Sequence, residues 1–424
     1  MKTLIKNGYV IDPANGICGI RDILIDGKVI SKVSENIRSA ADVTIDASGR
    51  IVMPGLVDMH VHLRQPGRED KETIYSGTKA ALKGGVTSLL AMPNTQPPMD
   101  SAVNIKLLKG ILKKDAQANV FICAAITKGR QGKEVSDISG LQQEGVVAVS
   151  DDGSSVDDKE VMAEALKKAG LNKVLVICHS EDKALSSGGM VNLGIISTRM
   201  GLRGMADEAE YKRVARDVEL AKEYSCPLHL AHISSQESVK IISLAKKKGV
   251  RITAEATPHH LSLNEEAVLG YDTNFKMNPP LRSKEDVQAL KKGLKEGIID
   301  VIASDHAPHT ENEKEIEFER AEFGVIGLET ILAVGITELV EPGFLDWPSL
   351  VEKLALNPAR ILGIDKGTLS PGKDADLVII DKEKEWLVER EGLISKSRNC
   401  PFLGRKLKGK VEYTFLGGKI AYKA

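Results

Sequence analysis

The sequence contains few aromatic residues and few cysteines, and its charges nearly cancel. Phe, Trp and Tyr make up only 4% of the 424 residues, so the core must be built mainly from Ile, Leu, Val, Ala and Met. The five cysteines are scattered and form no Cys-x-x-Cys pair, which supports neither a disulfide framework nor a cysteine-type zinc site. With 58 basic and 59 acidic side chains, nothing favours nucleic acid or an anionic membrane as a partner.

Long apolar runs are also absent. No uncharged stretch reaches the ~20 residues that a membrane span requires. The first residues, Met1–Asn7, contain no apolar core of signal-peptide length. The hydrophobic content of 42% is still ample for a large core. We therefore expect a soluble, cytoplasmic protein.

The middle of the chain alternates short apolar segments with amphipathic ones. Eight segments have the length and composition of buried strands: Ile51–His60, Thr87–Met92, Val120–Thr127, Val146–Ser150, Val174–His179, Leu228–His232, Arg251–Ala256 and Val301–Ser304. Helical periodicity marks Ala102–Lys114, Asp157–Ala169, Ala206–Tyr224, Gln236–Lys248 and Lys284–Lys295. This alternation over about 255 residues predicts an α/β fold, a TIM-like (β/α)₈ barrel.

Both ends of the chain have β-type patterns instead. These are Thr3–Ile11, Asp22–Ile25, Val29–Val33 and Val43–Asp46 at the start, and Ala375–Ile380, Trp386–Val388, Val411–Phe415 and Lys419–Tyr422 at the end. We expect the last helix to end near Asn357-Pro358. The pattern predicts a small β-sandwich domain built from residues 1–52 plus 365–424, with the barrel, residues 53–364, inserted between its halves.

The segment Glu311–Glu322 follows the last barrel strand and contains six glutamates. A solvated helix face is the simpler interpretation. We favour a loop that closes over the site as a lid, because barrel enzymes carry such loops after their strands.

Histidines and aspartates follow several of the predicted strands. His60 and His62 are two apart on one strand, so their side chains point to the same side, where two imidazoles can chelate Zn²⁺. His179, His232 and Asp305 each come directly after another apolar strand. Agreement among four strands predicts a metal site at the C-terminal mouth of the barrel.

A site with two metals needs an anion between them to screen their repulsion. The fourth strand ends in Asp151-Asp152, and either carboxylate could serve. His229 faces the side opposite His232, so we interpret it as a packed histidine. We also expect structural roles for His259 and His260.

The motifs around these residues resemble a known family. They are Pro54–Arg64, Ala91–Thr95, Ser150–Gly153, Lys276–Arg282, Ser304–His309, Asn357–Arg360 and Ser395–Asn399. The chain resembles the amidohydrolase superfamily and, within it, the bacterial dihydroorotases of the type also found beside aspartate transcarbamoylase. The resemblance covers nearly the whole chain.

The resemblance implies a role for each matching residue. His60, His62 and Asp305 would hold one zinc, and His179 and His232 the other. Many superfamily members bridge the two metals with a carboxylated lysine, but this chain has none there, and the subgroup it resembles has an aspartate that matches Asp152. The implied substrate contacts are His62, Arg64, Asn94, Asn278, His309 and the backbone of Phe323 and Gly324.

The implied activity is the reversible closure of N-carbamoyl-L-aspartate to L-dihydroorotate with loss of water, a step of de novo pyrimidine biosynthesis. Asp305 would act as general base and then as general acid. Zn²⁺ is the implied cofactor, with two sites per chain and their occupancy undetermined. The sequence does not decide between a monomer and a homo-oligomer, or whether aspartate transcarbamoylase is a partner.

Two alternatives compete with this interpretation. The chain could be another cyclic-amide hydrolase, namely a hydantoinase, a dihydropyrimidinase or an allantoinase, although most of their substrates have no carboxylate for Arg64 to bind. It could also be a non-catalytic scaffold for aspartate transcarbamoylase. A scaffold would be expected to have lost metal ligands, and none of the six candidates is missing.

Overall fold

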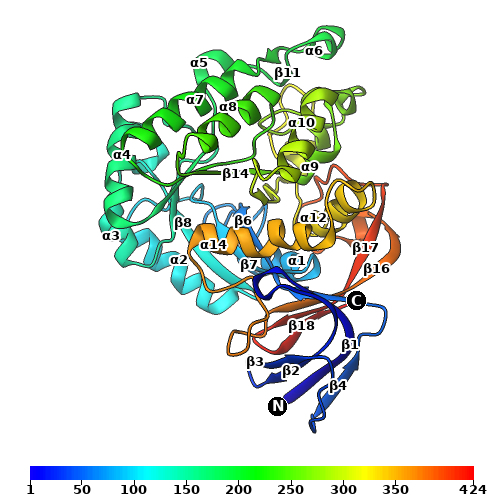
Figure 1. Cartoon of the computed structure of the whole chain (residues 1–424). Coiled ribbons are helices and arrows are strands. Elements are labelled where there is room, and N and C mark those ends of the chain that lie inside the picture. The colour runs from blue at the N-terminus through cyan, green and yellow to red at the C-terminus, as the bar shows by residue number, and fades with distance from the viewer.

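The computed structural model describes residues 1–424 and consists of a barrel with a β-sheet attached at one end (Figure 1). The barrel strands lie parallel, each beside the next along the chain. They are β6 (Leu56–Val61), β7 (Val86–Ala91), β8 (Asn119–Ala124), β9 (Ala148–Ser150), β10 (Leu175–Cys178), β13 (Leu228–Leu230), β14 (Ile252–Ala256) and β15 (Val301–Ile302). The predicted (β/α)₈ barrel is confirmed.

The barrel closes where β15 meets β6, through a few contacts rather than a continuous ladder. Val61 and His306 form an isolated parallel bridge, and the His62 N–H donates to the carbonyl of His306 at 2.9 Å. The buried carboxylate of Asp58 accepts the Ser304 N–H at 3.1 Å. Closure therefore brings the residues after β15 next to the His-x-His end of β6.

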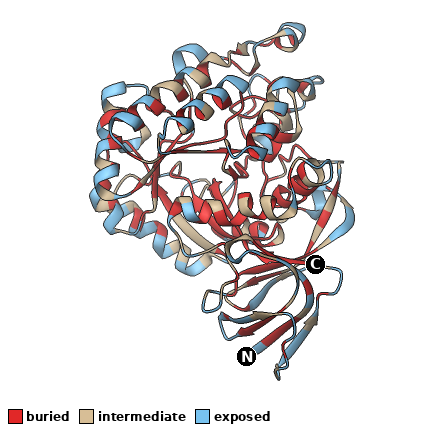
Figure 2. Cartoon of the chain, viewed as in Figure 1, coloured by how far each residue is buried: buried red, intermediate tan, exposed pale blue.

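Helices surround the strands and bury their apolar faces against them, while their outer faces are exposed (Figure 2). The longer ones are α1 (Ile74–Lys83), α2 (Ala102–Asp115), α4 (Lys159–Asn172), α7 (Glu208–Glu223), α8 (Gln236–Lys247) and α10 (Lys284–Lys295). Shorter ones are α3 (Ile138–Gln143), α9 (Pro258–Ser262), α12 (Ile331–Gly335), α13 (Trp347–Val351) and α14 (Asn357–Leu362). Between β10 and α7 the chain makes an excursion through α5 (Lys183–Ser186), β11 (Val191–Asn192), α6 (Ile195–Met200) and β12 (Gly204–Met205).

The two ends of the chain form one sheet, in the order β18-β17-β16-β5-β1-β2-β3, with β4 beside β1. Its strands are β1 (Lys2–Asp12), β2 (Ile17–Asp26), β3 (Val29–Ser34), β4 (Val43–Asp46), β5 (Ile51–Pro54), β16 (Leu377–Leu387), β17 (Lys406–Leu416) and β18 (Lys419–Lys423). A bridge between Val29 and Asp374 curls the sheet around its own small core. The terminal segments thus pair as the sequence predicts.

The predicted single strand Ile51–His60 is wrong, because the chain divides it at Gly55. Residues Ile51–Pro54 pair with β1 and β16 in the terminal sheet, whereas Leu56–Val61 belongs to the barrel. A Cβ at Gly55 would lie 2.2 Å from Oγ1 of Thr87, so only glycine fits where the chain passes between the two sheets. The division into 1–52 plus 365–424 and 53–364 stays a prediction, and β5 crosses its first boundary.

The last helix also differs from the prediction. It does not end near Asn357-Pro358 but continues through α14 to Leu362, where Gly363 ends it in the left-handed conformation with φ 67°. A proline inside a helix clashes with the carbonyl four residues earlier. The preceding turn, Glu352–Leu356, is a wider π-type turn, which makes room for the ring. No helix anywhere in the chain combines the length and apolar character needed to cross a membrane.

Candidate metal centre and active site

The six predicted metal ligands come together at the C-terminal mouth of the barrel. His60 lies in β6, and the others follow or end their strands: His62 after β6, Asp152 after β9, His179 after β10, His232 after β13 and Asp305 after β15. All six are buried. The ligand atoms of His60, His62 and Asp305 lie within 4.8 Å of one another, and so do those of His60, Asp152 and His232.

Asp152 lies at the centre of this cluster. Its Oδ1 is 3.3 Å from Nε2 of His60 and of His232 and 3.5 Å from Nδ1 of His179, and its Oδ2 is 3.3 Å from Nε2 of His62. Asp305 approaches from the other side, with Oδ1 3.1 Å from Nε2 of His62. One carboxylate therefore faces four imidazoles and the second faces two of them.

Asp151 points elsewhere, although it is the neighbour of Asp152. Its carboxylate accepts the backbone N–H of Thr127 at 3.1 Å and the hydroxyl of the same residue. It therefore connects the ends of β8 and β9. The backbone after β9 thus directs Asp152 to the cluster and Asp151 away from it.

Three of the four imidazoles donate a proton outward, away from the cluster. Nδ1 of His60 lies 2.6 Å from Oε1 of Glu255, and Nε2 of His179 lies 2.9 Å from Oε2 of Glu181. Nδ1 of His62 lies 2.8 Å from Oδ1 of Asn94. An outer hydrogen bond of this kind sets the tautomer of a metal-ligating histidine and leaves the inner nitrogen free to bind the ion. The donor set therefore fits divalent metal ions.

The electrostatics of the cluster also fit a cation at its centre. The inner nitrogen of His60, Nε2, is buried and makes no hydrogen bond, although two carboxylates lie close to it. Burial opposes protonation of His60, but Asp152, Glu255 and Asp305 raise its pKa well above the usual value. Burial likewise opposes ionisation of Asp305, yet His60 and His62 lower its pKa. Positive charge is thus favoured where these side chains meet, as a metal ion would supply it.

Three residues at the mouth have a left-handed backbone conformation. The φ angles are 62° for Arg64, 32° for His232 and 45° for Asp305. Residues other than glycine rarely adopt such angles, which are concentrated at functional sites. Each of these three residues follows the end of a barrel strand, and its left-handed conformation changes the direction of the chain there.

The predicted substrate contacts lie beside the cluster. Asn94 accepts from His62 and keeps its amide N–H groups for another partner. Asn278 donates to Oε2 of Glu181 at 3.0 Å, which connects it to His179. Arg64 donates through Nε to the carbonyl of Pro308 at 3.1 Å but has no carboxylate within ion-pair distance. Burial lowers the pKa of Arg64 to about 10, so an anion would relieve an unpaired guanidinium.

The backbone of Gly324 is fully engaged by the protein. Its N–H donates to the carbonyl of Lys276 at 3.0 Å, and its carbonyl accepts from Nζ of Lys314 and from Nδ2 of Asn399, each at 3.0 Å. A Cβ at Gly324 would lie 3.0 Å from Nε2 of His309. Gly324 thus lies against His309. Of the two residues predicted to contact substrate through the backbone, only Phe323 has a backbone N–H and carbonyl that are not already bonded within the protein.

The charged segment Glu311–Glu322 contains a short helix as well as turns. It begins with the short helix α11 (Glu311–Lys314) and continues in turns. The buried ammonium of Lys276 donates to the carbonyls of Phe318, Glu319 and Ala321 at 2.7, 3.0 and 2.6 Å. These bonds hold the end of the segment at the mouth of the barrel.

His229 and His260 have structural partners, whereas the buried Nε2 of His259 makes no hydrogen bond. His229 is buried, 2.8 Å from the hydroxyl of Thr253 and 3.1 Å from Glu255, so it is packed as the sequence predicts. His260 bonds to the hydroxyl of Thr257 and to the carbonyl of Pro279, at 2.8 and 2.9 Å.

Several residues of the site were missed in the sequence. Glu255 is one of them, although a carboxylate inside the buried strand β14 indicates a buried, positively charged or hydrogen-bonding partner. Burial opposes its ionisation, but His60 and His229 lower the pKa of Glu255 to about 2. Glu181 had no such signal, because its bond to Asn278 joins two loops that are far apart in sequence.

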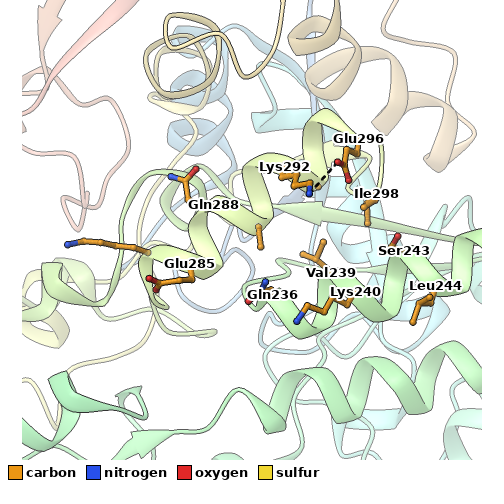
Figure 3. A pocket seen from close by; sticks show the side chains of 13 residues that line it. Gln236, Val239, Lys240, Ser243, Leu244, Glu285, Gln288, Lys292, Glu296 and Ile298 are labelled. Atoms are coloured by element: carbon orange, nitrogen blue, oxygen red, sulfur yellow. Dashed lines mark ion pairs between the residues drawn. The ribbon is translucent and has the colours of Figure 1, made fainter.

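The hollows of the surface differ in chemistry. A polar one of about 290 Å³ opens beside His309 and includes Lys314, Arg398 and Asn399. A larger one, about 740 Å³, lies on the outside of the barrel between α8 and α10 (Figure 3). It is lined by side chains such as Val239 and Leu244 and contains no cluster of catalytic groups, so the site is not there.

The chain is similar to known proteins in sequence and in fold. A family model described as dihydro-orotase-like matches residues 49–238. A dihydroorotase of Elusimicrobium minutum is 52% identical over 99% of this chain and 97% of that protein. One of Geobacter metallireducens is 48% identical over the full length of both. The solved structure of an L-hydantoinase (dihydropyrimidinase) from Arthrobacter aurescens superimposes with a TM-score of 0.90 at 26% identity, covering 99% of this chain and 95% of that one. The chain therefore belongs to the dihydroorotase family.

Proposed function

We propose that the chain interconverts N-carbamoyl-L-aspartate and L-dihydroorotate in pyrimidine biosynthesis, using Zn²⁺. One observation carries this proposal: four imidazoles and two carboxylates converge beside a half-buried guanidinium, Arg64, that has no ion-pair partner. The cluster suits a metal-dependent hydrolase, and the guanidinium suits a substrate with a free carboxylate.

The proposed ligands form two sets. His60, His62 and Asp305 would hold one ion, His179 and His232 the other, and Asp152 would lie between them. Imidazole and carboxylate ligands suit Zn²⁺, and Mn²⁺ or Co²⁺ accept similar donors. The chemistry that the metal supplies when bound is Lewis acidity toward water and toward a carbonyl oxygen.

The chain's own residues account for the proton transfers and for the orientation of the ring. In ring opening, Asp305 accepts a proton from the attacking water and delivers it to the leaving ring nitrogen. Arg64 offers planar paired donors to the substrate carboxylate. Asn94, which accepts from His62, has free N–H groups to offer as well. Asn278 can both donate to and accept from the ureide edge.

The test is an assay of ring opening of L-dihydroorotate by the purified chain, with metal content measured on the same sample. We expect activity that depends on metal and is specific for the L isomer. A preparation that is free of metal yet fully active would refute the metal assignment. A folded, metal-loaded chain that binds dihydroorotate without turning it over would instead favour the scaffold.

Arg64→Ala should mainly weaken substrate binding. The substrate carboxylate would lose a charge-assisted hydrogen-bond partner worth roughly 1.5–3 kcal/mol. This loss corresponds to an increase in KM of about 10- to 150-fold. The internal control is dihydrouracil, which lacks the carboxylate and should be little affected. If the unaltered chain processed both rings equally well, Arg64 would have no such role, and the hydantoinase alternative would gain.

The segment Glu311–Glu322 should become more protected when a substrate analogue binds. We expect it to close over the ring and to bring Phe323-Gly324 against it, as lids of barrel enzymes do. Hydrogen exchange of this segment, measured with and without the analogue, tests the motion. Identical exchange in both states would contradict a lid.

Association with other chains stays a hypothesis, as does the cytoplasmic location. Self-association and binding to aspartate transcarbamoylase are separate questions. Light scattering on the chain alone, and then on its mixture with purified aspartate transcarbamoylase, answers both.

A further inference from the structure

The ring of His309 is held between two cationic side chains. Its Nδ1 lies 3.0 Å from Nζ of Lys71, and its Nε2 lies 3.3 Å from Nη2 of Arg64. The backbone N–H of His309 donates to Oδ1 of Asn399 at 3.3 Å. His309 is buried, so these contacts replace water around the ring.

Lys71 is itself buried, in the loop between β6 and α1. Its ammonium lies 2.9 Å from Oε1 of Glu313, and this ion pair stabilises its charge. The other oxygen of Glu313 lies 3.5 Å from Nδ1 of His309, beyond the 3.0 Å of the lysine contact. Lys71 is thus the nearer partner of Nδ1.

An ammonium has three donors and no acceptor, so Nδ1 of His309 must be the acceptor in its bond with Lys71. A neutral imidazole then carries its proton on Nε2. The neighbouring positive charges favour the neutral ring: burial, Arg64 and Lys71 together lower the pKa of His309 to about 2.

The contact between Nε2 of His309 and Arg64 is then a contact between two donors. A guanidinium cannot accept a hydrogen bond either. Two donors 3.3 Å apart need a common acceptor, and a carboxylate with two oxygens matches them.

We propose that Lys71 selects the Nε2–H tautomer of His309. The two substrate contacts already implied by the resemblance, His309 and Arg64, then both present donors to the substrate carboxylate. Lys71 is a positioning residue, because it acts through His309. This inference rests on the proposed function for the identity of the ligand, but the tautomer itself does not depend on it.

The tautomer is measured by ¹⁵N NMR of the zinc-loaded full chain with labelled histidine, without substrate. The His309 signals are assigned by their loss in His309→Gln. We expect Nδ1 without a proton and Nε2 with one. A proton on Nδ1 would overturn the proposal. The expected tautomer in a chain with no dihydroorotase activity would instead overturn the proposed function.

Lys71→Met should raise KM for dihydroorotate about tenfold or more, with a smaller change in kcat and unchanged metal content. The matched control is Lys396→Met, because the Lys396 ammonium donates to the carbonyl of Glu69 and has no bond to His309. Unchanged KM in Lys71→Met would contradict the inference.

A second pair of variants keeps the inference testable if Lys71→Met fails to fold. The carboxamide of a glutamine reaches the position of Nε2, whereas that of an asparagine reaches only that of Nδ1. His309→Gln should therefore retain a lower KM than His309→Asn. The reverse order would show that the substrate needs the other nitrogen.

Discussion

Asp305→Asn should retain most of the bound metal while losing nearly all turnover. The carboxamide has the same size and keeps one oxygen near Nε2 of His62, where the native carboxylate oxygen lies at 3.1 Å. It cannot accept the proton that ring opening releases, and removing a general base costs about 10²–10⁴-fold in rate.

Metal stoichiometry and kcat, measured side by side on the variant and the unaltered chain, separate the two effects. A variant that kept full turnover would place the base elsewhere, with His309 as the next candidate. That result would also conflict with a proton held on Nε2 of His309, because a protonated nitrogen cannot act as a base.

Asp152→Ala should lose the second metal or bind it weakly, and activity should fall as a consequence. Asp152 is the carboxylate that contacts all four imidazoles, at distances of 3.3–3.5 Å. Without it, two dications a few ångströms apart would repel each other with no anion between them.

The matched control is Asp151→Asn, one residue away. Asp151 bonds to Thr127 and not to the cluster, so its substitution should leave the metal content unchanged. We expect a loss of stability of about 1 kcal/mol from the weakened buried hydrogen bond. If Asp151→Asn lost metal while Asp152→Ala kept it, the assignment of the two carboxylates would have to be exchanged.

Local sequence patterns predicted most of the helices and strands. The helix Lys284–Lys295 has the predicted bounds, because Ser283 and Asp286 form a capping box at its start. The strand Ile51–His60 was predicted as one element because most of its residues are apolar. Its division at Gly55 depends on Thr87, which lies far away in sequence, and no local pattern contains that contact.

The candidate ligands could be predicted because each follows a buried strand, and parallel barrel strands all end at one mouth. The sequence by itself determined this set of residues and, through the resemblance, their family. Only the tertiary structure decided which atoms meet: the Asp152 oxygens with four imidazoles, Glu255 behind His60, and Lys71 against His309. These contacts join residues distant in the chain, whose approach is set by closure of the barrel and packing of its core. The side-chain hydrogen bonds form only once these residues have been brought together, so no spacing along the sequence predicts them.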